Sequence, residues 1–171
     1  MAENRDKYLV FNLGDEFYGL PISKVREIIQ YVHITPLHQA DPSFKGVINL
    51  RGKIIPIIDM RRKFNMDEAA YGDRTVFIIV DYLGKKGVTQ MGIVVDSVQE
   101  VIDIPEGSLE KSPEIGIKLK SHYLYGIARQ DDKMIVIINI DRILDSEEML
   151  TIDKEVGSGV EIESYEGTVG A

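Results

Sequence analysis

The sequence predicts a mainly β protein built from two small five-stranded barrels that share a hydrophobic core. Ile and Val dominate and fall in short runs separated by Gly, Pro, Asp and Asn, which is typical of strands joined by turns. The chain also contains an internal repeat, and each copy supplies about five strands and a short helix. Five twisted strands can close into a barrel that leaves no exposed sheet edge. A chain of 171 residues, 44% of them hydrophobic, is long enough for two such units.

The expected strands are short, and the turns between them are explicit. Gly tolerates the positive φ of tight turns, so residues 14–16 and 83–87 are each expected to join two strands as a hairpin. The strands are predicted near residues 8–13, 17–21, 25–34, 54–59, 75–82, 88–95, 98–104, 126–129 and 134–139.

Helices are expected to be few and short. One is predicted to open at residues 41–44, where Asp41 is a good N-cap and Pro42 suits the first turn. Two others are predicted over residues 59–64 and 141–150. In the last of these the apolar residues, at 143, 144, 149 and 150, have roughly helical spacing, so one face of the helix can pack on a sheet.

The internal repeat has two parts. Residues 46–64 align without a gap with residues 126–144, an offset of 126 − 46 = 80, and residues 19–29 align with residues 92–102, an offset of 92 − 19 = 73. Any two strands rich in Ile and Val align to some extent, but ordered matches that include Gly and charged residues favour a duplication. The identical pairs of the second part are Gly19 and Gly92, Val25 and Val98, Glu27 and Glu100, and Ile29 and Ile102.

The repeat suggests a division of one domain, residues 1–171, into two subdomains. The first is expected at about residues 14–66 and the second at about residues 75–140. The first strand and the helix at 141–150 need neighbours, so these elements are open either to exchange between the subdomains or to bridge them. Residues 151–171 are acidic and contain Gly157-Ser158-Gly159, so we expect a flexible tail there.

Composition argues against several classes of function and location. The formal net charge of −8 disfavours nucleic acids and anionic membrane surfaces as partners. No stretch approaches the ~18 apolar residues of a membrane span, so no direct membrane insertion is expected. The N-terminus lacks the apolar run of a signal peptide, and the expected location is the cytoplasm. The sequence contains no Cys, which removes disulfides and thiol nucleophiles.

Sites for catalysis, cofactors and metals are not expected. The residues His33, His38 and His122 have no Cys or carboxylate cluster that would complete a zinc site. The sequence has no Gly-x-Ser-x-Gly elbow and no glycine-rich phosphate loop. Two alternatives to a binding protein for other proteins stay open: a small hydrolase whose residues assemble only in three dimensions, and a β-barrel module that binds an oligosaccharide or RNA. The acidic charge and the lack of Trp weaken the second.

Two features suit a binding function. Arg51 lies between Asn49 and Gly52, which bracket a tight connection that could hold the guanidinium in one direction. That Arg can serve a partner or pair with an acidic residue inside the fold, and both interpretations stay open. The doubled Val-x-Glu segments are apolar enough for the core, yet at a seam between two barrels they could line a groove for an amphipathic helix.

Three stretches resemble the chemotaxis coupling proteins of the CheW family. The first runs from Phe44 to Arg62 and the second from Gly92 to Ile102. The third combines Tyr123 to Gly126 with Ile137 to Leu144, and the whole resemblance extends from about Tyr8 to Met149. It implies two SH3-like five-stranded barrels around a joint core and no catalysis. It further implies a complex with the cytoplasmic tip of chemoreceptors (methyl-accepting chemotaxis proteins) and with the regulatory domain of the chemotaxis histidine kinase, in receptor arrays at the membrane.

The resemblance also implies positions for the two contacts. Val25, Gly46 and Arg51 fall where receptor binding in the family is sensitive to change, and we add Val98 because it is the repeat partner of Val25. The expected receptor site is thus a groove between the two barrels.

For the kinase contact, the resemblance indicates Glu27 and the strand surface around Ile28 to Val32. Neither a cofactor nor a metal is implied. The acidic tail has no counterpart in the family pattern.

Overall fold

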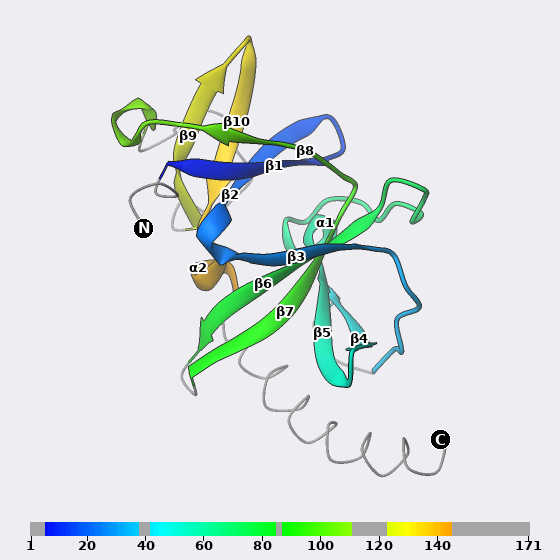
Figure 1. Cartoon of the computed structure of the whole chain (residues 1–171). Helices are drawn as coiled ribbons and strands as arrows, with labels where there is room; N and C mark the ends of the chain where they lie inside the picture. The colour runs from blue at the N-terminus through cyan, green and yellow to red at the C-terminus, as the bar shows by residue number, and fades with distance from the viewer. Residues whose placement is uncertain (1–5, 38–41, 85–86, 111–122, 145–171) are drawn as a thin grey trace, which may run out of the picture.

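The computed structural model describes residues 6–37, 42–84, 87–110 and 123–144, and these residues form two five-stranded mixed sheets with short helices (Figure 1). Sheet A has the strand order β8-β1-β2-β10-β9, and sheet B has the order β3-β6-β7-β5-β4. The strands are β1 (Lys7–Leu13), β2 (Glu16–Pro21), β3 (Val25–Gln30), β4 (Phe44–Leu50), β5 (Lys53–Asp59), β6 (Val76–Gly84), β7 (Gly87–Val95), β8 (Ser97–Asp103), β9 (Leu124–Gln130) and β10 (Lys133–Ile138). The helices are η2 (Ile22–Lys24), α1 (Met60–Lys63), η3 (Glu106–Ser108) and α2 (Ile140–Leu144).

Each sheet combines strands from both copies of the repeat. Strands β1 and β2 share sheet A with β8, β9 and β10, whereas β6 and β7 share sheet B with β3, β4 and β5. If each strand of one copy is replaced by its counterpart in the other, the order of sheet A becomes the order of sheet B. The sequence left open that the first strand is exchanged between the two subdomains. In the structure both β1 and β2 belong to the sheet that holds β8, β9 and β10. The subdomain boundaries at 14–66 and 75–140 stay a prediction, because strand pairing alone does not delimit a domain.

The chain passes from one sheet to the other at two points. The first is η2, between β2 of sheet A and β3 of sheet B, and the second is Asp96, between β7 of sheet B and β8 of sheet A. In Figure 1 the first crossover is the blue turn next to α2, where the upper and lower lobes meet.

Three hydrophobic clusters fill the described part of the protein, and the largest belongs to both sheets. It joins residues such as Phe11 of β1 to residues such as Ile93 of β7. Strands have a side-chain period of two, and β6 shows the consequence. Ile78 points into the shared cluster, while Phe77 and Ile79 belong to a second cluster within sheet B. A third cluster lies within sheet A. The shared core predicted from the repeat is thus present.

In each sheet, the segment that follows one outer strand forms an isolated backbone bridge with the other outer strand. The segment after β3 bonds to β4 in sheet B, and the segment after β8 bonds to β9 in sheet A. In sheet B, the Thr35 N–H donates to the Val47 carbonyl at 2.8 Å, and the Val47 N–H donates back at 2.9 Å. In sheet A, Glu110 and Ile127 exchange the same two hydrogen bonds, each 2.9 Å long. Closure into barrels stays a prediction, and these bridges are the contacts that such a closure would use.

The repeated Gly19 and Gly92 leave room for core side chains. Gly19 pairs with Ile137, and Gly92 pairs with Ile57, both in parallel register. A Cβ at Gly19 would lie 2.5 Å from Ile137 Cδ1, and one at Gly92 would lie 2.6 Å from Ile57 Cδ1. The Gly match between the two copies therefore marks the same packing requirement in each sheet.

The helix predicted to open at 41–44 is wrong. Phe44 begins β4, a strand that the sequence analysis missed, and the Ser43 carbonyl accepts a hydrogen bond from the Asp59 N–H at 2.8 Å. Pro42 and Ser43 form a turn before that strand, so the N-cap pattern led to the wrong element.

Other local predictions are confirmed over most of their length. Helix α1 lies within the predicted 59–64, and the Asp59 Oδ1 atom accepts a hydrogen bond from the Arg61 N–H at 2.9 Å, as an N-cap does. Helix α2 covers Ile140–Leu144, while the remainder of 141–150 and the tail lie outside the described residues. Strand β3 ends at Gln30, before the predicted 34. Among the described residues, no helix is both long and apolar enough to cross a membrane.

Candidate docking surface

Strands β3 and β8 are repeat partners, and each is an outer strand of its sheet. Val25 and Val98 are partly buried and pack against the shared cluster. Three residues further along, Ile28 and Val101 are 42% and 49% exposed. Both keep the repeat offset, 98 − 25 = 73 and 101 − 28 = 73. Each sheet thus presents one apolar edge where the shared core meets solvent, and we name the two the β3 edge (Val25 and Ile28) and the β8 edge (Val98 and Val101).

The strand register explains why these side chains reach solvent. Ile28 pairs with Ile78 on β6, and Val101 pairs with Leu9 on β1. Both partners belong to the shared cluster, so Ile28 and Val101 lie on the sheet faces that turn toward it. As residues of outer strands they have a strand neighbour on one side only. This is the sequence-predicted pair Val25 and Val98 extended by one further apolar position on each strand.

Arg51 lies at the tip of the β4–β5 hairpin. Arg51 and Gly52 have φ of +50° and +87°, the signs that a two-residue type I′ turn requires. The Asn49 Oδ1 atom accepts a hydrogen bond from the Gly52 N–H at 2.9 Å, which supports the turn. The expected bracket of Asn49 and Gly52 around Arg51 is therefore confirmed.

The Arg51 guanidinium forms an ion pair with Glu27 of β3. The side chain of Arg51 is 69% exposed and that of Glu27 is 32% exposed. The pair brings together one residue expected to bind the receptor and one expected to bind the kinase. Both interpretations of Arg51 therefore have a physical basis, because the guanidinium has an internal partner and also faces solvent.

Gly46 is buried and is no surface contact. Its φ is +136°, in the region that L side chains rarely adopt. A Cβ at this position would lie 2.1 Å from the Thr35 carbonyl oxygen and 2.8 Å from Pro36 Cα. A side chain at Gly46 would therefore displace the segment after β3 from β4. Any influence of Gly46 on binding must pass through that segment.

The segment after β3 carries exposed apolar side chains. Val32, which we expected in the kinase contact, is 44% exposed. Tyr31 is 41% exposed and packs against Tyr71 and Phe77, with ring centroids 5.3 and 5.5 Å apart. Tyr31 lies within the predicted surface from Ile28 to Val32 but was not predicted individually. The available signal was an aromatic residue two positions after the pair Ile28-Ile29.

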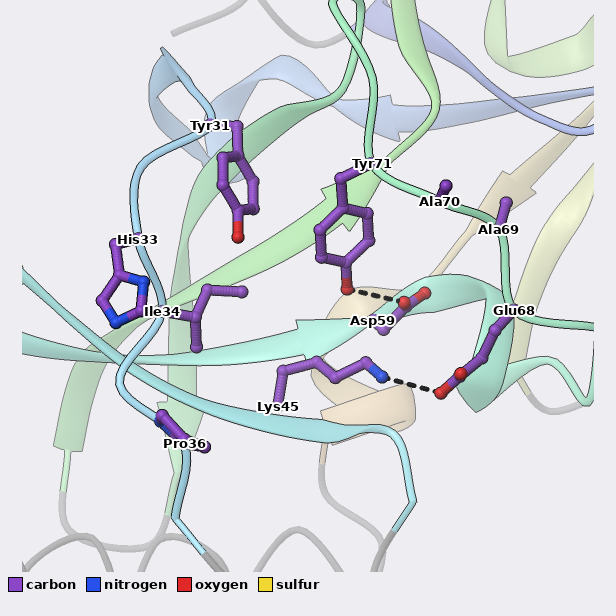
Figure 2. Close-up of a pocket in the computed structure, with 10 residues that line it drawn as sticks. All are labelled: Tyr31, His33, Ile34, Pro36, Lys45, Asp59, Glu68, Ala69, Ala70 and Tyr71. Carbon is purple, nitrogen blue, oxygen red and sulfur yellow. Dashed lines mark hydrogen bonds and ion pairs between the residues drawn. The ribbon is translucent and has the colours of Figure 1, made fainter.

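A hollow of about 420 Å³ lies beside this segment (Figure 2). In Figure 2 the Tyr31 and Tyr71 rings point into it from one side and Lys45 from the other. Four of its polar side chains form two pairs. The Tyr71 hydroxyl donates to Asp59 Oδ2 at 2.8 Å, and the Lys45 ammonium donates to Glu68 Oε1 at 2.7 Å.

The electrostatics of the hollow indicate structural pairs. Burial, together with the Asp59 carboxylate that accepts its proton, raises the pKa of Tyr71, so the phenol stays protonated. The hydrogen bond from Lys45 lowers the pKa of Glu68, which is exposed and stays charged. No group of three His, Cys, Asp or Glu within the described ranges could hold a metal ion.

Comparison with known proteins places the whole described structure within one family. Residues 7–148 match the family model described as the CheW-like domain. The chain is 37% identical over 147 residues to the chemotaxis protein CheW of Klebsiella aerogenes, covering 86% of each chain. It is 30% identical over 142 residues to the chemotaxis protein CheW of Bacillus subtilis, covering 83% of this chain and 88% of that one. The crystal structure of the scaffolding protein TtCheW from Thermoanaerobacter tengcongensis is similar with a TM-score of 0.75 and 38% identity, covering 85% of this chain and 93% of that chain.

Proposed function

The chain belongs to the family of CheW-like domains, and from that membership we propose that it couples the cytoplasmic tip of a chemoreceptor to the regulatory domain of a chemotaxis histidine kinase. It is a chemotaxis scaffold, and the family is non-catalytic. We place it in the cytoplasm, recruited to receptor arrays at the membrane. The observation that supports the coupling role best is the matched pair of apolar edges on β3 and β8 at the border of the shared core.

For the receptor contact, we propose the β3 edge and the β8 edge together with Arg51. A receptor tip is a helical hairpin, and an amphipathic helix docks through apolar residues spaced along one face. Val25, Ile28, Val98 and Val101 offer apolar surface on both sheets for such a stripe. Arg51 lies at the β4–β5 turn and forms an ion pair with Glu27 of β3. Because its guanidinium is mostly exposed, it can also bind a polar group of the receptor.

For the kinase contact, we propose the outer surface from Glu27 to Val32. Ile28 and Val32 are each more than two-fifths exposed, and Tyr31 adds an exposed aromatic ring beside Val32. Ile28 faces the shared cluster and therefore belongs to both proposed contacts, whereas Tyr31 packs against Phe77 on the other face. Neighbouring exposed apolar side chains typically mark protein interfaces, and aromatic residues are enriched among those that dominate binding energy. The two proposed contacts share β3, which would link them mechanically.

The experiment is co-purification and calorimetry with a chemoreceptor cytoplasmic fragment and the kinase regulatory domain, separately and together. We expect Val98→Asp to raise the receptor Kd by about tenfold or more and to leave kinase binding unchanged, because a buried unpaired charge is costly. Val88→Asp is the matched control for an added charge at an exposed Val, since Val88 is 66% exposed at the start of β7 and is assigned to neither contact. Equal receptor affinity of the two variants would refute the proposed receptor contact.

A further inference from the structure

Two ion pairs lie at the two points where the chain crosses between the sheets. At the first crossover, the Lys24 ammonium donates to both carboxylate oxygens of Asp141 on α2, at 2.9 and 2.8 Å. The backbone N–H of Leu83, near the end of β6, donates to the same carboxylate at 3.1 Å. Helix α2 follows β10 of sheet A, and β6 belongs to sheet B, so Asp141 ties both sheets to the crossover.

The second crossover has the same arrangement with reversed charges. Here the carboxylate is Asp96, in the crossover itself, and the cation is Arg61 on α1. The Arg61 Nε atom donates to Asp96 Oδ1 at 2.9 Å, and the Nη2 atom donates to Oδ2 at 2.5 Å. The backbone N–H of Gly14, in the β1–β2 turn of sheet A, donates to Oδ2 at 2.7 Å. Helix α1 follows β5 of sheet B, so this carboxylate also ties both sheets to the crossover.

The repeat shows that the two pairs are counterparts. Arg61 and Asp141 occupy equivalent helix positions, 141 − 61 = 80. Their partners lie one position apart in the repeat, because Lys24 corresponds to Ser97, which follows Asp96. The helix residue is the cation Arg61 in one copy and the anion Asp141 in the other. The crossover residue is correspondingly the anion Asp96 or the cation Lys24. The arrangement thus occurs in both copies of the repeat although the residues that form it differ.

Both pairs are well placed to hold a fixed geometry. Their side chains are 22% and 33% exposed for Lys24 and Asp141, and 19% and 30% exposed for Arg61 and Asp96. Both pairs are less exposed than the pair of Lys7 with Asp103 and the pair of Arg51 with Glu27, and partly buried pairs are screened less by salt than surface pairs. Each carboxylate accepts three or more hydrogen bonds in all, which fixes its orientation.

Each ion pair also adjoins an apolar edge of the docking surface. Lys24 directly precedes Val25, the first residue of β3, and Asp96 stands two residues before Val98 on β8. We propose that Lys24 with Asp141, and Asp96 with Arg61, are positioning residues that set the placement of β3 and β8 relative to each other, and through it the fit of the receptor tip. The second half of this inference rests on the proposed function, while the first half does not.

The test measures the placement of the two strands directly. The chain has no Cys, so Ile28→Cys and Val101→Cys can carry the only two nitroxide labels, one on each exposed edge residue. Dipolar electron spin resonance then gives the distance distribution between the labels in the free protein. We expect Lys24→Gln to broaden or shift this distribution and Arg61→Gln to do the same. We expect the double exchange Lys24→Asp with Asp141→Lys to restore it.

The matched control is Lys7→Gln. Lys7 pairs with Asp103 at 2.9 Å, but both residues belong to sheet A and their side chains are 39% and 70% exposed, so the distribution should not change. The variant Lys24→Asp alone would place two carboxylates together and can fail to fold. The test therefore uses Lys24→Gln, which removes the charge without creating repulsion. An unchanged distribution in Lys24→Gln and Arg61→Gln overturns the inference.

Receptor binding, measured on the same variants without labels, separates the two halves of the inference. We expect Lys24→Gln to raise the receptor Kd about fivefold and the double exchange to recover most of that loss. A changed distance distribution with unchanged receptor affinity would confirm the positioning role and refute receptor docking through β3 and β8. A lower affinity with an unchanged distribution would refute the positioning role alone.

Discussion

The β4–β5 and β9–β10 hairpins are the same structure with opposite chemistry at their tips. Arg51 and Gly52 have φ of +50° and +87°, and Asp131 and Asp132 at the equivalent positions have φ of +50° and +66°. The first turn carries a cation that pairs with Glu27, whereas the second carries two carboxylates. Glu27 itself recurs as Glu100, so the acidic residue is common to both copies while the residue at the hairpin tip differs.

This difference shows which properties the duplication preserved. Backbone geometry, the strand order of the sheets and the glycines beside the core are the same in both copies. Charges at the two hairpin tips differ, so Arg51 has no cationic counterpart at the second tip. The variants below test both the shared and the divergent features.

The largest expected effect comes from the glycines that precede the paired bridges. Gly46→Ala should lower the free energy of unfolding by about 3 kcal/mol or more, since its Cβ would lie 2.1 Å from the Thr35 carbonyl oxygen at a strained φ of +136°. Gly126→Ala should cost about 1–2 kcal/mol, because its nearest backbone contact, the Glu110 carbonyl oxygen, would be 2.8 Å away. Urea denaturation measures both. Equal losses would show that the two bridges tolerate a side chain alike.

The glycines also show how far a sequence can predict this fold. The repeat predicted two similar units with a shared core, because matched Gly and apolar positions reflect local packing in each copy. It could not predict that β2 pairs in sheet A beside β10, since the pairing of distant strands leaves no local pattern. Strand β4 was missed because Lys45 and Gly46 interrupt its alternation, and the bulge between Phe44 and Gly46 shows the same irregularity in the structure.

The candidate site was predictable at its centre and less so at its margins. Val25 and Val98 were identified as repeat partners, and both border the shared core. The ion pair of Arg51 with Glu27 joins residues 24 positions apart on different strands, and no periodicity reveals such a contact. Likewise, Gly46 could be marked as sensitive, but only the distance of a built Cβ from Thr35 shows that a side chain there would displace the segment after β3.

The next prediction tests the asymmetry between the two hairpin tips. Arg51→His should raise the receptor Kd by about tenfold, because the imidazole cannot reproduce the rigid fork of donors. The free energy of unfolding should change by less than about 1 kcal/mol, since an exposed ion pair contributes little to stability. Asp131→His is the matched control at the equivalent turn, and we expect its receptor affinity to stay within about twofold of the parent. If Arg51→His binds receptor and kinase like the parent, the site assignment is wrong.

The smallest expected effect concerns acid stability at the second crossover. Burial alone would raise the pKa of Asp96, but the hydrogen bonds from Arg61 and from the Gly14 N–H outweigh it and lower that pKa below its usual value. A carboxyl whose folded pKa is depressed contributes stability that is fully present above its unfolded pKa of about 4 and is lost as the pH falls through the folded value.

We therefore expect the urea midpoint of the parent to fall more steeply between about pH 4 and pH 2 than that of Arg61→Gln, which removes the main partner of Asp96. Lys7→Gln serves as the control, because it deletes an exposed ion pair within one sheet and should keep the parent's slope. Parallel pH profiles for the parent and Arg61→Gln would mean that Asp96 gains no net stabilisation from the arginine. The second crossover would then be held by the Gly14 hydrogen bond and by packing, and the two crossovers would differ in mechanism as the two hairpin tips differ in charge.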